Sequence, residues 1–279
     1  MSARHIVLTG AAGFVGSRIA HALGSDERFA NDRITLTDIA LKEELTDDRF
    51  HLVEGDLSDP SVREEVVGQG VDILLHLAAV MGGTAEANPK LARLVNIETT
   101  LDLLESVYNP EKPPRVVFAS SIAVFGPPLP DQIDDDTVPL PRMIYGAQKR
   151  MIEVAIEHAT DRGWIDGLAL RLPGIVARRD ADSRLKSAFL NLMFYDYAAG
   201  RSMTLPVSAE GTTWLISVPA CVEAFLHAAT LPAGLAGRRR AFTLAARRVR
   251  IGELVEGLSR LIPNSLAKVD YQPDPDLHA

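Results

Sequence analysis

The chain has 279 residues, 47% hydrophobic and 24% charged, which is the composition of a folded globular protein and excludes disordered and fibrous classes. Its formal net charge of −8 argues against general binding to nucleic acid or to an anionic membrane, since both need a basic surface. The only cysteine, Cys221, excludes an internal disulfide and a multi-cysteine metal site. With no apolar run of membrane-spanning length, we predict a soluble cytoplasmic protein without a bound metal.

Short apolar, β-branched runs alternate with segments of helical period through the first part of the chain. The predicted strands are 4–8, 34–37, 51–54, 72–76, 115–119 and 165–171. The main predicted helices are 14–23, 89–108 and 143–162. This alternation is typical of β-α-β units, so we predict an α/β fold with a doubly wound parallel sheet of the Rossmann type.

After Arg171 the alternation weakens, and four prolines divide the rest into shorter pieces of mixed type. We therefore predict two domains. Residues 1–172 form the cofactor-binding Rossmann domain, and residues 173–279 form a smaller mixed α/β substrate lobe from which the chain can return to the Rossmann sheet.

A glycine-rich segment, 9–16, follows the first predicted strand and opens the first predicted helix. Glycines permit a tight turn and a close approach of the backbone to a pyrophosphate, whose charge the helix N-terminus then meets. The spacing is Gly-x-x-Gly-x-x-Gly rather than the general Gly-x-Gly-x-x-Gly, and a plain structural turn is the alternative. The candidate cofactor-binding residues are Gly10, Gly13, Phe14, Val15 and Gly16.

Two acidic residues follow the next two strands. Asp38 ends the second strand, where a carboxylate accepts hydrogen bonds from both ribose hydroxyls and repels a 2′-phosphate, so NAD is favoured over NADP. Asp56, with Leu57 beside it, comes after the third strand and is a candidate contact for the adenine. Helix capping through Ser58 or Asp59 is the competing interpretation of that segment.

Tyr145 and Lys149 are four residues apart in a predicted helix, so both side chains lie on one helix face. A lysine ammonium in that position favours ionisation of the phenol. A phenol tuned in this way can take a proton from an alcohol. The pair alone is weak evidence, because ordinary helix surfaces often contain it.

With the glycine segment, Asp38, the strand end at 76–79 and Tyr-x-x-x-Lys in order, the chain resembles the extended short-chain dehydrogenase/reductases over about its first 175 residues. The resemblance implies that Tyr145 is the general base, that Lys149 holds the nicotinamide ribose, and that Ser121 hydrogen-bonds the reacting oxygen. It also implies further residues that bind or support the cofactor, namely Leu77, Ala78, Ala79, Asn96 and Pro173.

Two departures narrow the choice within that family. Ser121 is followed by Ile122 and Ala123, whereas the similar dehydratases have an acid pair at this point. The nucleotide-sugar epimerases have an asparagine shortly after the arginine that matches Arg171, and this chain has Pro and Gly there. Dehydration and a nucleotide-sugar substrate are therefore disfavoured.

The segments 170–178, 214–217 and 226–229 resemble the D-erythronate dehydrogenase group. This implies NAD-dependent oxidation of a secondary alcohol on a small sugar acid. The carboxylate of such a substrate needs a cation, for which Arg178, Arg184 and Lys186 are candidates, with Arg178 preferred. The candidate substrate contacts are Ser121, Tyr145, Gly82, Arg178 and Trp214.

Two other functions compete with this one. A nucleotide-sugar epimerase would return the hydride to its substrate without net reduction of NAD. A nucleotide-sensing regulator would keep the fold without the chemistry, although such relatives usually lose the tyrosine or the lysine. By analogy with the family, the long helix and the Tyr145 helix are expected to form a homodimer contact.

Overall fold

The computed structural model describes residues 3–41, 48–130, 132–134, 136–178 and 188–275. Its contacts divide the chain into two compact units. The first consists of Met1–Leu172 with Pro219–Leu244, and the second consists of Pro173–Val218 with Ala245–Ala279. The chain thus leaves the first unit after Leu172 and later returns to it. The candidate cations Arg184 and Lys186 lie outside the described residues.

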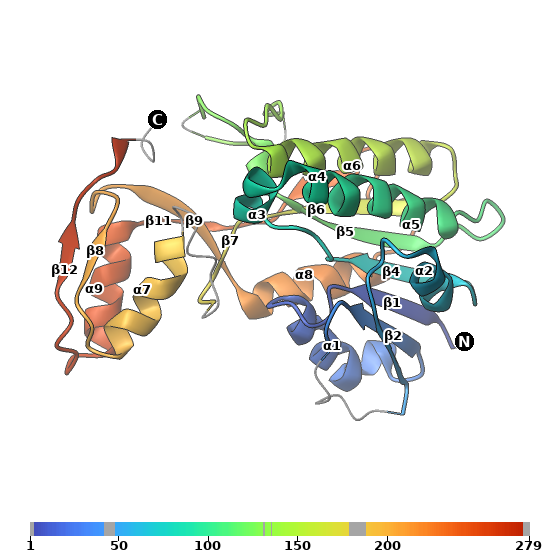
Figure 1. Cartoon of the computed structure of the whole chain (residues 1–279), viewed down its shortest axis with the longest axis horizontal. Coiled ribbons are helices and arrows are strands. Elements are labelled where there is room, and N and C mark those ends of the chain that lie inside the picture. The colour runs from blue at the N-terminus through green and yellow to red at the C-terminus, as the bar shows by residue number, and fades with distance from the viewer. Residues whose placement is uncertain (1–2, 42–47, 131, 135, 179–187, 276–279) are drawn as a thin grey trace. The chain divides into compact units, whose positions relative to one another are not determined.

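The first unit is built on a seven-stranded sheet in the order β10-β6-β5-β4-β1-β2-β3, and every neighbouring pair is parallel (Figure 1). This confirms the predicted doubly wound parallel sheet. The order reverses between β1 and β4, and ligands of such sheets bind outside the carboxyl ends of the strands at that point. The strands are β1 (His5–Thr9), β2 (Arg33–Asp38), β3 (Phe50–Glu54), β4 (Ile73–His76), β5 (Arg115–Ser121), β6 (Asp166–Leu172) and β10 (Ala241–Thr243).

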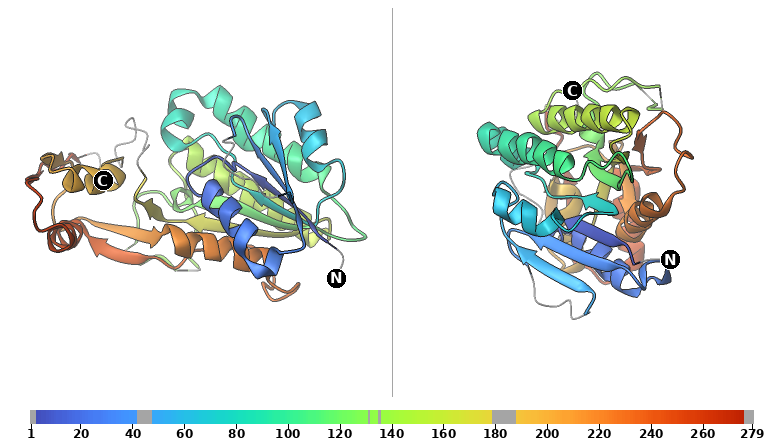
Figure 2. Two further views of the ribbon diagram at one scale, coloured as in Figure 1. Left: turned by 90° about the horizontal axis from the view of Figure 1, so that it is seen from below. Right: turned by 90° about the vertical axis from the view of Figure 1, so that its right-hand side faces the viewer.

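Helices cover both faces of this sheet, as Figures 1 and 2 show. One face carries α2 (Pro60–Val67), α4 (Pro89–Arg93), α5 (Thr100–Ser106) and α6 (Ile144–Asp161), with the short α3 (Gly82–Ala87) beside them. The other carries α1 (Gly16–Ser25) and α8 (Val218–Thr230), which contains the fully buried Cys221. The strands β1, β4 and β5 are buried between these layers, which explains their continuous apolar runs.

The helix predicted over 89–108 is not one regular helix. A π-helical segment, η2 (Leu94–Thr99), separates α4 from α5, and the last helical residue is Ser106. Directly after this segment, the Thr100 hydroxyl donates to the carbonyl of Val95 within it. Hydrophobic periodicity reports which side of a helix is buried and carries no signal for such a local change of winding.

The second unit holds two small sheets. Strands β11 (Arg247–Arg250), β9 (Thr212–Ser217) and β7 (Gly174–Val176) form one, and β12 (Val269–Tyr271) and β8 (Met203–Leu205) form the other. The helices α7 (Phe189–Ala198) and α9 (Ile251–Leu261) share an apolar core with β8 and β12. In the part of the chain that is described, no helix combines the length and the apolar character needed to cross a bilayer.

Candidate active site

The glycine-rich loop packs directly on the end of strand β4. Gly10 has φ +71°, and a Cβ at this position would lie 2.8 Å from the backbone nitrogen of Ala78. Only glycine fits both constraints. Gly13, Phe14 and Val15 form the turn that follows, and helix α1 begins at Gly16, two residues later than predicted. The loop therefore has the shape that a dinucleotide pyrophosphate requires, and its contact with the cofactor stays a prediction.

Asp38 at the end of β2 is already linked to this loop. Its Oδ2 accepts a hydrogen bond from the Ala12 N–H at 2.9 Å, and its Oδ1 accepts one from Ile39 at 2.8 Å. A carboxylate has about four acceptor positions, so each oxygen keeps room for a ribose hydroxyl. The two backbone bonds hold the carboxylate beside the loop in a fixed orientation.

The carboxylates of Asp56 and Asp59, which follow β3, each accept a backbone hydrogen bond in a different turn. Asp56 accepts a hydrogen bond from Ser58 N–H at 2.8 Å, and Asp59 caps helix α2 by accepting from Ser61 N–H at 2.8 Å. Asp59 is thus the helix cap, as the competing interpretation proposed. The Leu57 side chain is buried in the core. The adenine contact of Asp56 and Leu57 stays a prediction.

Tyr145 and Lys149 lie one turn apart in α6, and both are buried. The Lys149 Nζ lies 5.4 Å from the centre of the Tyr145 ring and 4.5 Å from the centre of the Phe118 ring. Burial lowers the pKa of Lys149 to about 7, and the nearby Glu153 carboxylate acts in the opposite direction. The Tyr145 hydroxyl points toward Met81 Sδ at 4.0 Å.

Ser121 ends β5 and caps the short 3-10 turn η3 (Ile122–Val124). Its Oγ accepts a hydrogen bond from Ala123 N–H at 3.1 Å, so the serine hydrogen is left to donate. The first turn of α6 rests on the same turn, because a Cβ on Gly146 would lie 2.0 Å from the Ala123 carbonyl oxygen. Ser121 and Tyr145 are thus attached to two backbone segments in direct contact.

Asn96 supports this site from the π segment. Its Oδ1 accepts from Val80 N–H at 2.7 Å, and its Nδ2 donates to Val80 O at 3.0 Å and to Gln148 Oε1 at 2.8 Å. Both amide hydrogens are therefore used within the protein. Asn96 holds the segment after β4 and the residue next to Lys149, and a direct contact with the cofactor stays a prediction.

A buried ion pair between Glu153 and Arg171 lies one helical turn after Lys149, and the sequence did not predict it. Glu153, 0% exposed, accepts two bonds of 2.9 Å from Arg171 and a third, of 2.6 Å, from the Ser120 hydroxyl. Tyr145, Lys149 and Glu153 follow one another at intervals of four, which is the signal that could have identified this carboxylate. Ser120 thus helps to orient the Glu153 carboxylate.

The remaining substrate candidates belong to different units. Gly82 begins α3 in the first unit, whereas Pro173, Arg178 and Trp214 lie in the second. The Arg178 N–H donates to Asn191 Oδ1 at 2.8 Å, and its buried Nε has no hydrogen-bond partner among the described residues. Trp214 is half-buried on β9, opposite Arg248 of β11. Their contacts with substrate stay predictions.

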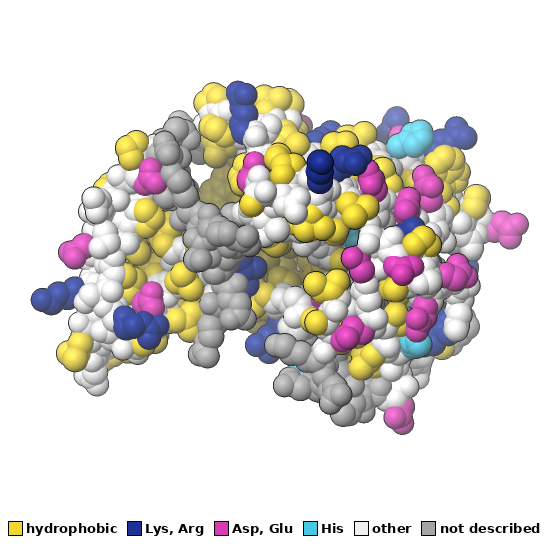
Figure 3. Space-filling model, in the orientation of Figure 1, with side chains coloured by type: hydrophobic (Ala, Val, Ile, Leu, Met, Phe, Trp, Pro, Cys, Tyr) yellow, Lys and Arg dark blue, Asp and Glu magenta, His cyan; other side chains and the backbone are white. Residues whose placement is uncertain are grey.

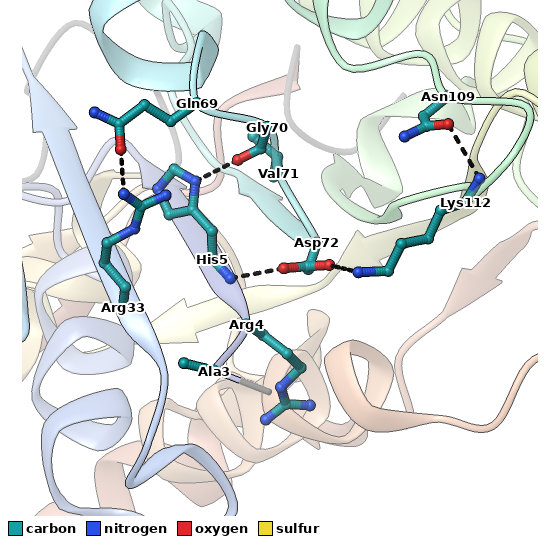
Figure 4. Close-up of a pocket in the computed structure, with 10 residues that line it drawn as sticks. All are labelled: Ala3, Arg4, His5, Arg33, Gln69, Gly70, Val71, Asp72, Asn109 and Lys112. Carbon is teal, nitrogen blue, oxygen red and sulfur yellow. Dashed lines mark hydrogen bonds and ion pairs between the residues drawn. The ribbon is translucent and has the colours of Figure 1, made fainter. Parts of the chain in front are cut away.

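A cavity of about 430 Å³ lies elsewhere, at the amino ends of the strands (Figure 4). Its Lys112 pairs with Asp72 at 2.5 Å, and its Arg33 donates to the side-chain oxygen of Gln69. His5 is held by the Gly70 carbonyl oxygen, 2.5 Å from its Nδ1. None of the ten residues drawn there is a predicted site residue. Volume alone thus does not locate the predicted redox site.

Replacing Lys149 with Met should stabilise the cofactor-free protein at pH 7. The ordinary pKa is 10.5 and the folded value is about 7, so between them the unfolded chain binds more protons and the stability of the natural protein rises with pH. Below pH 7 the penalty of the buried charge is at its full size. The gain from Met should therefore be largest at pH 6 and shrink by pH 10, as measured by urea unfolding.

The matched control for this experiment is Lys90→Met, on the exposed surface of α4. Its effect should be small and should not change with pH. A Lys149→Met protein that is less stable than the natural protein at every pH would contradict the assignment of a destabilising buried charge.

The sequence and the fold both match known proteins. Residues 6–241 match the NAD dependent epimerase/dehydratase family. The D-erythronate dehydrogenase of Cupriavidus necator is 34% identical over 94% of this chain and 83% of its own length. That of Haemophilus influenzae is 33% identical over 81% and 72%. A structure described as the nucleoside-diphosphate-sugar epimerase from Agrobacterium tumefaciens superposes with a TM-score of 0.88 at 28% identity, covering 100% of this chain and 84% of that one.

Proposed function

The chain belongs to the NAD dependent epimerase/dehydratase family, and from this we propose that it is an NAD-dependent dehydrogenase that oxidises a secondary alcohol of a small sugar acid to the keto acid. The family and the two D-erythronate dehydrogenase relatives support a dehydrogenase of the extended short-chain type with a nicotinamide cofactor. A D-erythronate-like aldonate is the substrate class that these relatives favour. We propose that the first unit binds NAD and carries the catalytic residues, and that the second unit binds the substrate.

One observation carries the proposal. The Lys149 ammonium is buried one helical turn from Tyr145 and lies over the faces of two aromatic rings. Burial strengthens its electrostatic effect on the phenol, because little water screens it. A lysine kept out of water beside a tyrosine costs stability, which argues for a chemical role rather than a structural one.

In the proposed mechanism, Tyr145 in its phenolate form takes the proton of the substrate hydroxyl, and Lys149 stabilises that phenolate. The Ser121 hydroxyl donates to the same substrate oxygen and orients it. A nicotinamide dinucleotide held by the loop at Gly10, by Asp38 and by Lys149 would supply the acceptor for the hydride of the substrate carbon. The cradle at Gly10, where a side chain would clash, fits a dinucleotide, and Asp38 favours NAD over NADP.

We assign the substrate carboxylate to Arg178. Its buried Nε lacks a hydrogen-bond partner among the described residues, and a buried donor of this kind calls for an acceptor. A carboxylate supplies that acceptor through a charge-assisted bond. Gly82 and Trp214 are proposed as further substrate contacts.

The direct test is a screen of four- to six-carbon aldonates with NAD, measured as NADH formation at 340 nm. We expect turnover with at least one four-carbon acid, and much less with the corresponding uncharged polyol, because the polyol lacks the carboxylate. NADP should be a poor replacement for NAD. If no acid reduces NAD but a nucleotide sugar is epimerised, the proposed dehydrogenase activity is wrong.

A nucleotide-sugar epimerase is the second candidate. It is favoured by the structural match to the Agrobacterium tumefaciens protein described as a nucleoside-diphosphate-sugar epimerase. In that reaction the same base and cofactor act, and NADH does not accumulate. The two candidates are therefore distinguished when nucleotide sugars are incubated in parallel with the aldonates and their products are analysed for epimers.

We also propose that the protein is a cytoplasmic homodimer formed through its outer helix layer. Leu91 and Leu94 on the α4 side, and Met151 and Val154 on α6, are apolar and between 39% and 56% exposed. Hydrophobic side chains gather over the face that these helices occupy (Figure 3). Such a surface is typical of an interface between two copies. Light scattering should give the mass of a dimer, and a monomer would remove this part of the proposal.

A further inference from the structure

Three buried polar side chains connect the end of β4 to its neighbours: Thr9 on β1, His76 on β4 and Thr100 on α5. All three are less than 3% exposed. The His76 ring lies between the two hydroxyls, with Nδ1 at 2.7 Å from Thr9 Oγ1 and Nε2 at 3.1 Å from Thr100 Oγ1. Because water does not reach them, each donor and acceptor needs a partner inside the protein.

The position of the ring proton follows from the bonds made by Thr9. Its hydroxyl oxygen accepts hydrogen bonds from the Leu77 and Ala78 N–H groups, both at 3.2 Å. A hydroxyl has two acceptor lone pairs and one hydrogen, so the hydrogen of Thr9 is left to donate. It donates to His76 Nδ1, which must therefore carry no proton.

The other side of the ring completes this assignment. With Nδ1 bare, the neutral ring carries its hydrogen on Nε2 and donates it to Thr100 Oγ1. The Thr100 hydroxyl then donates to the carbonyl of Val95 at 3.2 Å. Each group in this series thus donates to the next, from the Leu77 and Ala78 N–H groups through the side chains of Thr9, His76 and Thr100 to the Val95 carbonyl of the π segment.

The environment of His76 also requires a neutral ring. It stacks on Phe118 at 5.9 Å, and the Lys149 Nζ lies over the same phenyl ring. Burial lowers the pKa of His76 to about 3, and the charge of Lys149, which faces the ring, acts in the same direction. A charged His76 would also present a second N–H to a Thr9 hydroxyl that has no lone pair left.

We propose that His76 is a positioning residue which, as the neutral Nε2–H tautomer, links the glycine-loop strand to the π segment and thereby fixes residues 77–80 for cofactor binding. Thr9 holds the start of this segment, and Asn96 holds Val80 at its end through two hydrogen bonds. Gly10 packs against the same backbone, so a shift of residues 77–80 would change the shape of the loop. The inference relies on the proposed function only for the identity of the cofactor.

The first test removes the hydrogen bond between His76 and Thr100 without changing any residue of the glycine-rich loop. Thr100→Val keeps the side-chain volume and removes the hydroxyl, and we expect a roughly fivefold rise in the Kd for NADH, the size that loss of one hydrogen bond produces. Thr100→Ser keeps the hydroxyl and should bind NADH within about twofold of the natural protein. NADH binding is measured by fluorescence, so the result does not depend on any substrate.

The preceding residue, the last of the π segment, offers a matched control. The Thr99 hydroxyl is buried one residue away, and it has no hydrogen-bond partner in the structure described here. Thr99→Val should therefore leave the Kd for NADH unchanged. If Thr100→Val and Thr99→Val bind NADH equally well, or if Thr100→Val only lowers the melting temperature, the proposal is overturned. If no aldonate reduces NAD but the variants bind NADH as expected, the proposed dehydrogenase activity is rejected and the positioning role of His76 is retained.

The second test uses the natural protein. Nitrogen-15 NMR of labelled histidine should show His76 with a bare Nδ1 and a protonated Nε2 at both pH 6 and pH 9. An Nδ1–H tautomer, or an imidazolium at pH 6, would overturn the proposal. If the Thr100→Val protein does not fold, this measurement decides the question by itself.

Discussion

Replacement of Tyr145 by Phe is expected to lower kcat by about 10²–10⁴-fold, the contribution typical of a positioned general base. The phenyl ring stays, so the packing of α6 on its buried neighbours and the aromatic face beside the Lys149 Nζ are retained. The Kd for NAD should therefore change by no more than about twofold, well below the change in turnover. Single-turnover kinetics and NAD binding, measured on the same preparation, separate the two quantities.

The matched control is Tyr108→Phe. Tyr108 is partly buried in the first unit, where its ring packs against Trp164 at 5.0 Å. Loss of this hydroxyl should leave kcat unchanged. Substantial turnover in the Tyr145→Phe protein would reject the assignment of Tyr145 as the base, whatever the substrate is.

The positions of the strands along the chain and of the glycine-rich loop could be predicted because both depend on local patterns. Apolar β-branched runs such as 5–9 and 73–76 specify buried strands, and a glycine at a positive φ specifies the turn after the first of them. The four-residue spacing of Tyr145 and Lys149 predicted their common helix face for the same reason. These features need no knowledge of a distant partner.

The supporting bonds could not be predicted, because their partners are far apart in the sequence. His76 meets Thr9 across 67 residues and Thr100 across 24, and a histidine at a strand end does not reveal either partner. Asn96 reaches Gln148 across 52 residues. Such pairs depend on how strands and helices pack, which periodicity does not encode.

Replacing Glu153 with Gln is expected to lower the free energy of unfolding by about 3–5 kcal/mol, because it leaves the Arg171 guanidinium buried without its counter-ion. The Glu153 side chain is 0% exposed and that of Arg171 is 9% exposed, so water cannot replace the lost partner. Glu157→Gln is the control, since this carboxylate is 37% exposed and lies 3.7 Å from Arg150, and its loss should cost less than about 1 kcal/mol. Urea unfolding measures all of these values.

The double variant Glu153→Met/Arg171→Met tests whether the cost comes from the unpaired charge. Removing both charges eliminates the buried ion, so the double variant should be more stable than either single one, which requires a coupling energy of about 3 kcal/mol or more. The Glu153 carboxylate also raises the pKa of Lys149, so its loss should shift the alkaline limit of turnover to lower pH. Additive losses in the double variant, or a Glu153→Gln protein as stable as Glu157→Gln, would show that the pair is not a coupled unit. A lower stability without any shift of the pH profile would limit Glu153 to holding α6 against β6, and would leave the ionisation of Lys149 to burial and the two aromatic rings.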